Sequence, residues 1–205
     1  MNIGLIQFKS EGSKEKNLNK SLGLISDLAK KGAKVICLQE LFLTDYFCFE
    51  ENPAFYDLSD VLANSQCIKQ LSVVSQNEGV VLIASCFEKR VEGVYHNSVL
   101  VFDKGVLLGV YRKQHIPDDP GYYEKYYFTP GDEGYKVWDP SEGKIGVLVC
   151  WDQWYPEAAR ATVLKGAEII FYPTAIGWDM DDEEIIRKEE IAVSYTHLTL
   201  PTKRI

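Results

Sequence analysis

Three residues that could do chemistry stand where apolar segments of this sequence end. Glu40 and Cys150 close the apolar segments 35–39 and 144–149, and Lys113 follows a third such segment. A desolvated carboxylate can act as a base. A thiol on a strand-to-helix turn lies near backbone N–H groups, which can lower its pKa and bind an oxyanion. With a fixed lysine charge opposite them, these groups predict attack of a thiol on a carbonyl carbon.

Each of these residues also has an ordinary structural interpretation. Glu40 could lie in a surface turn or a structural ion pair, and Lys113 could be a solvated strand end. A buried cysteine is a common small core residue. We apply that last interpretation to the other four cysteines, which are Cys37, Cys48, Cys67 and Cys86. No one of the three residues decides between chemistry and structure by itself.

The elements that must position these residues alternate between apolar strands and amphipathic helices. Strands are predicted over 2–8, 34–38, 80–87, 95–102, 106–111, 144–149 and 168–172. Helices are predicted over 17–31, 65–76 and 156–165. The turn residues at 103–105 predict a hairpin, and the segment 116–134, which has no periodicity, predicts a loop.

The sequence also contains an internal repeat. Residues 3–7 are similar to 145–149, and residues 31–36 are similar to 165–170, where both segments begin with Lys-Gly-Ala. Each half therefore predicts a strand–helix–strand unit with parallel strands, and the two units predict two similar sheets. The alternative is that Lys-Gly-Ala is simply a good helix ending. Because parallel sheets bind ligands beyond the carboxyl ends of their strands, the repeat places the three chemical residues where a site is expected.

Three motifs in order along the chain contain these residues. They are Leu-Gln-Glu-Leu-Phe at 38–42, Tyr-Arg-Lys-Gln-His-Ile-Pro at 111–117 and Val-Cys-Trp-Asp at 149–152. This set resembles the three signatures of the nitrilase superfamily of carbon–nitrogen hydrolases. The resemblance narrows at 116–128 and 150–157, which are similar to the N-carbamoylputrescine amidase family.

The resemblance implies an α/β fold, a nitrilase-like α-β-β-α sandwich of two similar sheets, and a thiol-dependent hydrolase. In such an enzyme Cys150 would be the nucleophile and Glu40 its base. Lys113 and the backbone N–H of Trp151 would stabilise the oxyanion, so Trp151 is the expected substrate-binding residue. Glu124 takes the place of the family's second glutamate, which helps orient the site. The resemblance implies no metal and no organic cofactor.

The resemblance also implies a small-molecule carbamoyl-amine substrate, N-carbamoylputrescine, which would give putrescine, carbon dioxide and ammonia. A cationic diamine calls for a carboxylate or an aromatic face. Asp118, Asp119 and Asp152 are candidates, although such residues beside prolines and helix starts usually serve turns and caps. Asp152-Gln153 stand where enzymes for carboxylate-bearing substrates need a basic pair, which favours an amine. An N-carbamoyl-D-amino-acid hydrolase, an ω-amidase and an inactive fragment remain alternatives.

The composition is that of an ordinary globular chain and bounds its partners. Of 205 residues, 46% are hydrophobic and 25% charged, and 22 Lys and Arg against 30 Asp and Glu give a net charge of −8. This acidic balance argues against a nucleic acid or a membrane surface as a partner. The sequence has no signal-like start and no apolar run long enough to span a membrane. Its five scattered cysteines disfavour disulfide and zinc frameworks and indicate a cytoplasmic location.

The family resemblance runs from residue 1 to about residue 178 and then decays. Residues 1–192 are therefore interpreted as a truncated carbon–nitrogen hydrolase domain, with an acidic helical stretch at 179–190. Residues 193–205 are interpreted as a non-native tail. A chain with the family's usual ending is expected to be more soluble and more stable, and to form the family's homo-oligomer.

Overall fold

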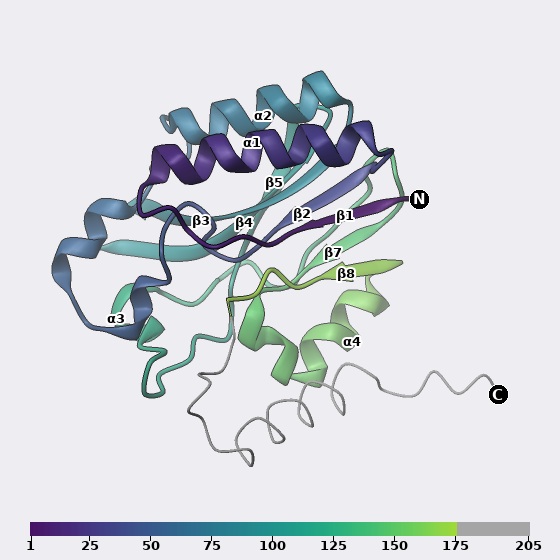
Figure 1. The fold of residues 1–205 in the computed structure, drawn as a ribbon. Helices are drawn as coiled ribbons and strands as arrows, with labels where there is room; N and C mark the ends of the chain where they lie inside the picture. The colour runs from purple at the N-terminus through teal and green to yellow at the C-terminus, as the bar shows by residue number, and fades with distance from the viewer. Residues whose placement is uncertain (176–205) are drawn as a thin grey trace, which may run out of the picture.

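The computed structural model describes residues 1–175, and its helices and strands are arranged in four layers (Figure 1). In chain order the elements are β1 (Ile3–Ile6), α1 (Lys14–Lys30), β2 (Val35–Leu38), η1 (Phe47–Phe49), η2 (Pro53–Leu58), α2 (Gln66–Glu78), β3 (Val81–Val91), β4 (Val94–Asp103), β5 (Val106–Arg112), α3 (Glu124–Tyr127), β6 (Val137–Trp138), β7 (Ile145–Val147), η3 (Cys150–Trp154), α4 (Pro156–Leu164) and β8 (Ile169–Phe171). The interpretations of 179–190 and of the boundary at 192/193 lie outside the described residues.

Two sheets form the inner layers. The larger has the order β1-β2-β3-β4-β5, in which β1, β2 and β3 are parallel and the β3–β4 and β4–β5 pairs are antiparallel. The smaller has the order β6-β7-β8, in which β7 and β8 are parallel. Helices α1 and α2 cover the outer face of the larger sheet, and α4 lies outside the smaller one (Figure 1). The predicted α-β-β-α sandwich is confirmed.

The internal repeat corresponds to the two parallel strand–helix–strand units, β1-α1-β2 and β7-α4-β8. In both units a glycine of the first strand lets the helix approach closely. A Cβ on Gly4 would lie 2.8 Å from the side chain of Leu28, and one on Gly146 would lie 2.3 Å from that of Thr162. A side chain at either position would force the helix side chain opposite it to shift, so the repeated glycines reflect repeated packing. The internal repeat in the sequence therefore corresponds to a repeat in the structure.

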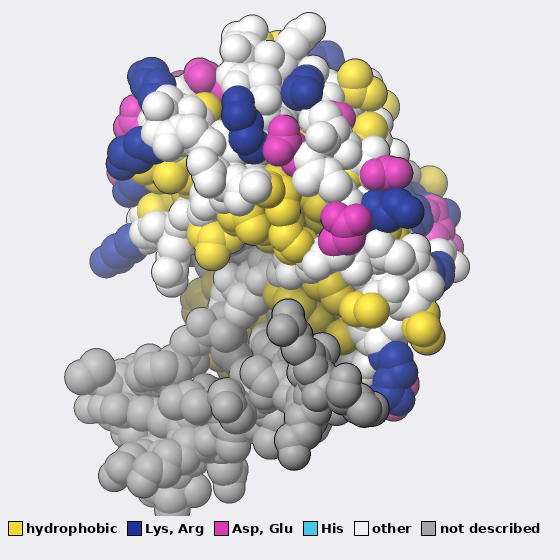
Figure 2. Space-filling model, turned by 90° about the vertical axis from the view of Figure 1, so that its right-hand side faces the viewer, with side chains coloured by type: hydrophobic (Ala, Val, Ile, Leu, Met, Phe, Trp, Pro, Cys, Tyr) yellow, Lys and Arg dark blue, Asp and Glu magenta, His cyan; other side chains and the backbone are white. Residues whose placement is uncertain are grey.

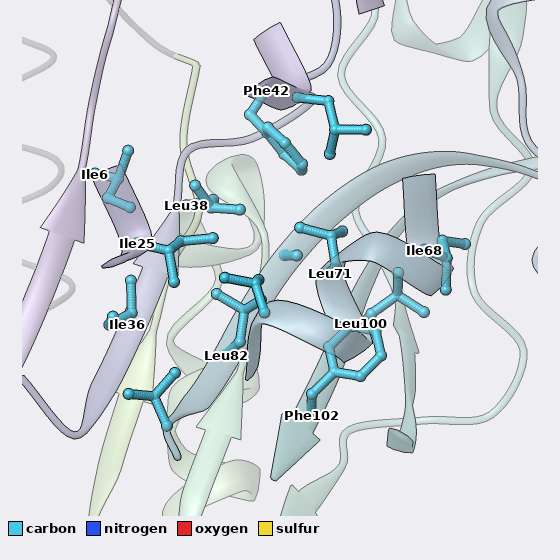
Figure 3. Close-up of a cluster of buried hydrophobic side chains, with 14 of the residues drawn as sticks. Ile6, Ile25, Ile36, Leu38, Phe42, Ile68, Leu71, Leu82, Leu100 and Phe102 are labelled. Carbon is cyan, nitrogen blue, oxygen red and sulfur yellow. The ribbon is translucent and has the colours of Figure 1, made fainter. Parts of the chain in front are cut away.

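Two apolar clusters fill the spaces between the layers. The first lies between α1, α2 and the larger sheet, and it contains Ile25 of α1, Leu71 of α2 and Leu82 of β3 (Figure 3). The second lies between the two sheets and contains Val35 and Val147, both fully buried. Burial of apolar surface on both faces of the larger sheet explains why its central strands are continuous hydrophobic runs rather than alternating ones.

The helices begin and end at residues with clear capping roles. Ser13 accepts a hydrogen bond from the backbone N–H of Lys16 at the start of α1, and Ser65 accepts one from Ile68 at the start of α2. Gly79 ends α2 in the left-handed conformation, with φ of 63°. The serine cap places the start of α1 three residues before the predicted 17–31.

The main differences from the sequence prediction are short elements. The predicted strands and hairpin are present, but β6 has two residues, and η1 and η2 are single 3-10 segments. The predicted loop 116–134 contains the four-residue helix α3. Elements this short show too little periodicity to detect, because one or two turns or two strand residues give at most one or two repeats of the pattern.

The surface near the amino-terminal end of β1 is partly apolar. Figure 2 shows hydrophobic side chains grouped in a band across the middle of this face, with Lys, Arg, Asp and Glu side chains mostly around it. Met1, Ile3 and Leu5 are among the exposed large hydrophobic residues of the chain. Within residues 1–175 we find no helix with the length and apolar character needed to cross a membrane.

Candidate active site

Glu40 is held at a strained turn just beyond the carboxyl end of β2. The next residue, Leu41, has a φ of 49°, which is rare for a residue with a branched side chain. Its backbone N–H donates to the hydroxyl of Ser85 on β3, 3.0 Å away, and this bond fixes the turn to the neighbouring strand. Glu40 is only 2% exposed although it carries a carboxylate. The turn therefore presents a buried charged group at the edge of the larger sheet.

Cys150 occupies a similar turn beyond the carboxyl end of β7. It has a φ of 41° and is the first residue of η3. Its backbone N–H donates to the carbonyl of Pro173, 3.0 Å away, so the segment after β8 supports the turn. Left-handed backbone at residues other than glycine costs free energy and persists where surrounding structure demands it. Both predicted catalytic turns thus share an unusual backbone conformation.

Lys113, the residue after β5, brings the two predicted glutamates together. Its side chain is fully buried. The Nζ atom lies 3.1 Å from Oε1 of Glu40 and 2.7 Å from Oε2 of Glu124, and it also donates to the other oxygen of Glu124 at 2.9 Å. Glu124 begins α3 and accepts a further hydrogen bond from the hydroxyl of Tyr46, 2.9 Å away. One ammonium is therefore shared by two buried carboxylates.

The electrostatics of this cluster keep Lys113 charged. Burial by itself would lower the pKa of Lys113, but Glu40, Glu124 and Cys150 outweigh it and hold the pKa above its ordinary value. For Glu124 burial is the largest effect and Glu40 adds to it, so its pKa rises to about 7 although Lys113 acts in the opposite direction. The site thus has a permanent cation beside a carboxyl group that titrates near neutrality.

The Cys150 thiol is not activated at rest. Burial raises its pKa well above the usual range, Glu40 and Glu124 raise it further, and Lys113 and the backbone amide of Ala175 lower it only in part. Backbone N–H donors can lower the pKa of such a thiol, but desolvation beside two carboxylates outweighs them here. Burial beside two carboxylates thus favours the neutral thiol of Cys150 over its thiolate.

The other cysteines are also neutral thiols. Burial raises the pKa of Cys37 to about 12 and raises that of Cys48 and Cys86 as well. Cys48 is close enough to the cluster for Glu124 and Glu40 to raise its pKa further. Cys67 is partly exposed on α2. These positions agree with the core interpretation for Cys37, Cys48 and Cys86.

Comparison with known proteins decides the family. The sequence profile of the family described as carbon-nitrogen hydrolase matches residues 2–198. The chain belongs to this family. A citrullinase of Francisella tularensis is 44% identical over 175 residues, covering 85% of this chain and 61% of its own length. An N-carbamoylputrescine amidase of Arabidopsis thaliana is 43% identical over 182 residues, covering 88% of this chain and 60% of its own length.

The fold comparison agrees with the sequence comparison. A crystal structure of a carbon–nitrogen hydrolase from Helicobacter pylori superposes with a TM-score of 0.88 at 46% identity, covering 96% of this chain and 69% of that one. An amidase from a Nesterenkonia species has the same fold, with a TM-score of 0.74 at 24% identity, covering 88% of this chain and 66% of that one. The chain thus spans about three fifths of the length of the curated relatives named above.

One polar residue beside this cluster was not predicted from the sequence. Asn97 on β4 is fully buried; its side-chain amide donates to Oε1 of Glu40 at 2.7 Å, and its backbone carbonyl accepts from the backbone N–H of Lys113 at 2.9 Å. It therefore holds both residues at once. The signal was present, since His96-Asn97-Ser98 interrupt an otherwise apolar strand with buried polar groups.

The backbone amide of Ala175 completes the surroundings of Glu40. It donates to Oε2 of Glu40 over 2.8 Å. Together with Asn97 and Lys113, this gives donors to both oxygens of the carboxylate. Ala175 is the last described residue and could not be singled out from the sequence, because the contact depends on the path of the chain after β8 rather than on its side chain.

The three aspartates considered for an amine group have different surroundings. Asp152 is fully buried and accepts hydrogen bonds from protein donors on both of its oxygens, so it is wrong as an amine-binding candidate. Asp118 is exposed, 4.0 Å from Nζ of Lys125. Asp119 is exposed and, after burial and Asp152, helps to raise the pKa of Tyr155. Asp119 is the candidate that remains near the Cys150 turn.

Trp151, the expected substrate-binding residue, is half-buried directly after Cys150. Its ring packs edge-on against Tyr155, with 5.2 Å between ring centroids. The expected contact from its backbone N–H to an oxyanion stays a prediction. In the part of the chain that the structure describes, no group of three or more His, Cys, Asp and Glu side chains is arranged to hold a metal ion.

Proposed function

We propose that this chain carries the catalytic part of an amidase that removes a terminal carbamoyl group from an amine through a covalent thiol intermediate. The observation that carries the proposal is the buried Lys113 ammonium, which two carboxylates hold beside a Cys150 turn. A cation buried at such cost is expected where negative charge develops during a reaction. The names of the relatives, citrullinase and N-carbamoylputrescine amidase, support a carbamoyl-amine substrate.

The first half of the reaction forms a carbamoyl thioester. Glu40 takes the proton from Sγ of Cys150 as the sulfur attacks the carbonyl carbon of the R–NH–CO–NH₂ group. The carbonyl oxygen becomes an oxyanion, which Lys113 and the backbone N–H of Trp151 stabilise. The tetrahedral intermediate then collapses: its C–NH₂ bond breaks, Glu40 returns the proton to nitrogen, and ammonia leaves.

The second half releases the enzyme. Glu40 takes a proton from a water molecule, whose oxygen attacks the thioester carbon. The C–S bond breaks, the proton passes from Glu40 to Sγ, and the carbamate R–NH–COOH leaves and decomposes to an amine and carbon dioxide. Glu124 holds Lys113 in place through both steps. The resting Cys150 thiol suits this route, since its proton goes to Glu40 only as the new bond forms.

N-carbamoylputrescine is the substrate that we propose, and citrulline is the second candidate because of the citrullinase relative. Both molecules present the same carbamoyl group on a short aliphatic chain that ends in an ammonium. They differ in the α-carboxylate that citrulline carries. Exposed Asp119 near Tyr155 favours the substrate without that carboxylate, because like charges repel.

Ammonia release tests the proposed function. We expect release from N-carbamoylputrescine, less from L-citrulline, and least from N-carbamoyl-D-amino acids and simple ω-amides. Asp119→Asn is expected to raise KM for N-carbamoylputrescine several-fold. The rate of ammonia release from N-carbamoylputrescine should then exceed that from citrulline by a smaller factor than in wild type. Release from ω-amides alone would overturn the carbamoyl-amine proposal, and a preference for citrulline that Asp119→Asn does not change would overturn the role of Asp119.

The pH profile should report Glu124. Its pKa of about 7 means that, as pH falls below neutrality, the carboxyl gains a proton and its ion pair with Lys113 weakens. Wild-type kcat is therefore expected to fall on the acid side of about pH 7. In Glu124→Gln this inflection should vanish and kcat should be low throughout, by about tenfold or more. Glu92→Gln, at an exposed hairpin turn, is the control. An unchanged acid limb in Glu124→Gln would contradict this assignment.

A further inference from the structure

Another buried carboxylate, Asp152, lies outside the reaction described above. It is fully buried, and the charge of an isolated buried carboxylate is costly. Asp152 does not contact Lys113, and its nearest partner that can carry a charge is the ring of His115. Its burial therefore needs another explanation.

Asp152 accepts four hydrogen bonds from two segments of the chain. Oδ2 accepts from the hydroxyl of Tyr111 at 2.7 Å and from the backbone N–H of Val149 at 2.9 Å. Oδ1 lies 3.0 Å from the backbone nitrogen of His115 and 2.8 Å from its ring Nδ1. Because an ionised carboxylate only accepts, Nδ1 of His115 carries the proton that it donates.

The donors bracket the two residues whose relative position matters most. Tyr111 and His115 stand two residues before and two residues after Lys113, and Val149 directly precedes Cys150. The first two belong to the larger sheet and the loop that follows it, whereas Val149 follows β7 of the smaller sheet. Asp152 therefore ties the segment that carries the cation to the turn that carries the nucleophile.

Aromatic packing reinforces this connection. The ring of His115 stacks on Tyr155, the residue before α4, with 3.6 Å between centroids and 10° between planes. Tyr155 in turn packs edge-on against Trp151, directly after Cys150. The loop after Lys113 is thus attached to η3 by a carboxylate on one side and by stacked rings on the other.

We propose that Asp152 is a positioning residue that fixes the Cys150 sulfur relative to the Lys113 ammonium across the junction between the two sheets. It touches neither substrate nor reacting atoms. The positive φ of Cys150 is maintained because Asp152, two residues on, holds the N–H of Val149 on the other side of the turn. The expected effect of Asp152 on turnover rests on the proposed function, but its expected effect on the reactivity of Cys150 does not.

Only a carboxylate side chain, which accepts hydrogen bonds on both of its oxygens, can accept from all four donors. In Asp152→Asn the amide nitrogen would face either the N–H of Val149 or that of His115, and one buried donor would lose its partner. The Tyr111 hydroxyl can rotate and accept from an amide, so this contact survives. Tyr111→Phe removes one of the four donors and leaves the carboxylate and both backbone bonds in place.

The test compares the rate at which iodoacetamide alkylates Cys150, followed by mass spectrometry of its peptide, with kcat and KM for N-carbamoylputrescine. Because small displacements of reacting groups cost large factors in rate, we expect Asp152→Asn to lower both the alkylation rate and kcat by about tenfold to a hundredfold, with KM nearly unchanged. Tyr111→Phe should give a smaller loss in the same two quantities.

Ser75→Ala is the matched control. Ser75 is fully buried, and its hydroxyl bonds to Val80 and Gly105 far from the site, so its loss lowers Tm without moving the catalytic turns. The proposal is overturned if Cys150 is alkylated as fast in Asp152→Asn as in wild type. It is also overturned if Asp152→Asn, at a similar fall in Tm, loses no more of its alkylation rate and kcat than Ser75→Ala does. If Asp152→Asn does not fold, Tyr111→Phe decides by the same comparison. Should wild type release no ammonia while the alkylation rates keep the expected order, the proposed function fails and the role of Asp152 stands.

Discussion

Cys150→Ser is expected to lower ammonia release from N-carbamoylputrescine by on the order of a thousandfold or more, while the protein stays folded. The side chain is buried at the end of β7, and a hydroxyl fits in the space of the thiol. Serine is a far weaker nucleophile at neutral pH, and one carboxylate base is too weak to remove its proton. Circular dichroism and Tm measured beside kcat separate loss of chemistry from loss of fold.

Cys67→Ser is the matched control for this variant. Cys67 is partly exposed on α2, on the opposite side of the larger sheet from the site, so kcat should not change. Mass spectrometry of a reaction stopped early should also detect a carbamoyl adduct on the Cys150 peptide of wild type. Full activity in folded Cys150→Ser would rule out the covalent route and leave Glu40 as the base for direct attack by water.

The sequence could predict where the candidate residues lie, because strand ends can be recognised locally. Glu40 and Cys150 each follow an apolar strand, and Lys113 follows another, so their side chains had to emerge at sheet edges. The topology of the sheets decides which strand ends lie close together. The internal repeat indicated part of that topology, because each strand–helix–strand unit requires parallel strands. Those two inferences place Glu40 and Cys150 at corresponding ends of the two repeated units, whereas Glu124 was expected only from the family resemblance.

The supporting residues could not be predicted in the same way. Asn97 and Asp152 act by contacts with residues far away in the sequence, and each has a common local explanation as a strand polar residue or a helix-start acid. The raised pKa of Cys150 was also missed, because it depends on burial beside two carboxylates that come from distant segments. Such properties belong to the packed structure, and local pattern does not contain them.

The site depends on how the two sheets pack. Glu40 and Lys113 come from β2 and β5 of the larger sheet, whereas Cys150 comes from β7 of the smaller one. The apolar cluster between the sheets, which includes Val35 and Val147, therefore sets the distance between Glu40 and Cys150. Asn97 fixes base and cation within the larger sheet, and Asp152 fixes the cation segment to the nucleophile turn across the junction.

Lys113→Met is expected to damage both stability and chemistry. The substitution leaves Glu40 and Glu124 buried without their cation, and breaking a buried ion pair from one side costs about 3–5 kcal/mol of unfolding free energy. It also removes the charge that stabilises the oxyanion, so kcat is expected to fall by about a hundredfold to a thousandfold. Urea unfolding and ammonia release measure the two effects. Lys69→Met, at an exposed position on α2, should show neither.

The stability loss in Lys113→Met should depend on pH in a direction that the site dictates. Lys113 lowers the pKa of Glu124, so without it this pKa rises further above the value of about 7 in wild type. A carboxyl whose pKa is raised by folding contributes stability that is fully present below its unfolded pKa of about 4.3 and is lost as pH rises through the folded value. Glu40 also loses its cation, so a gap in unfolding free energy between wild type and variant remains near about pH 5, and it should be larger near about pH 8. A gap that is constant with pH would mean that Glu124 does not depend on Lys113 for its charge, and the shared-ammonium description of the site would have to be abandoned.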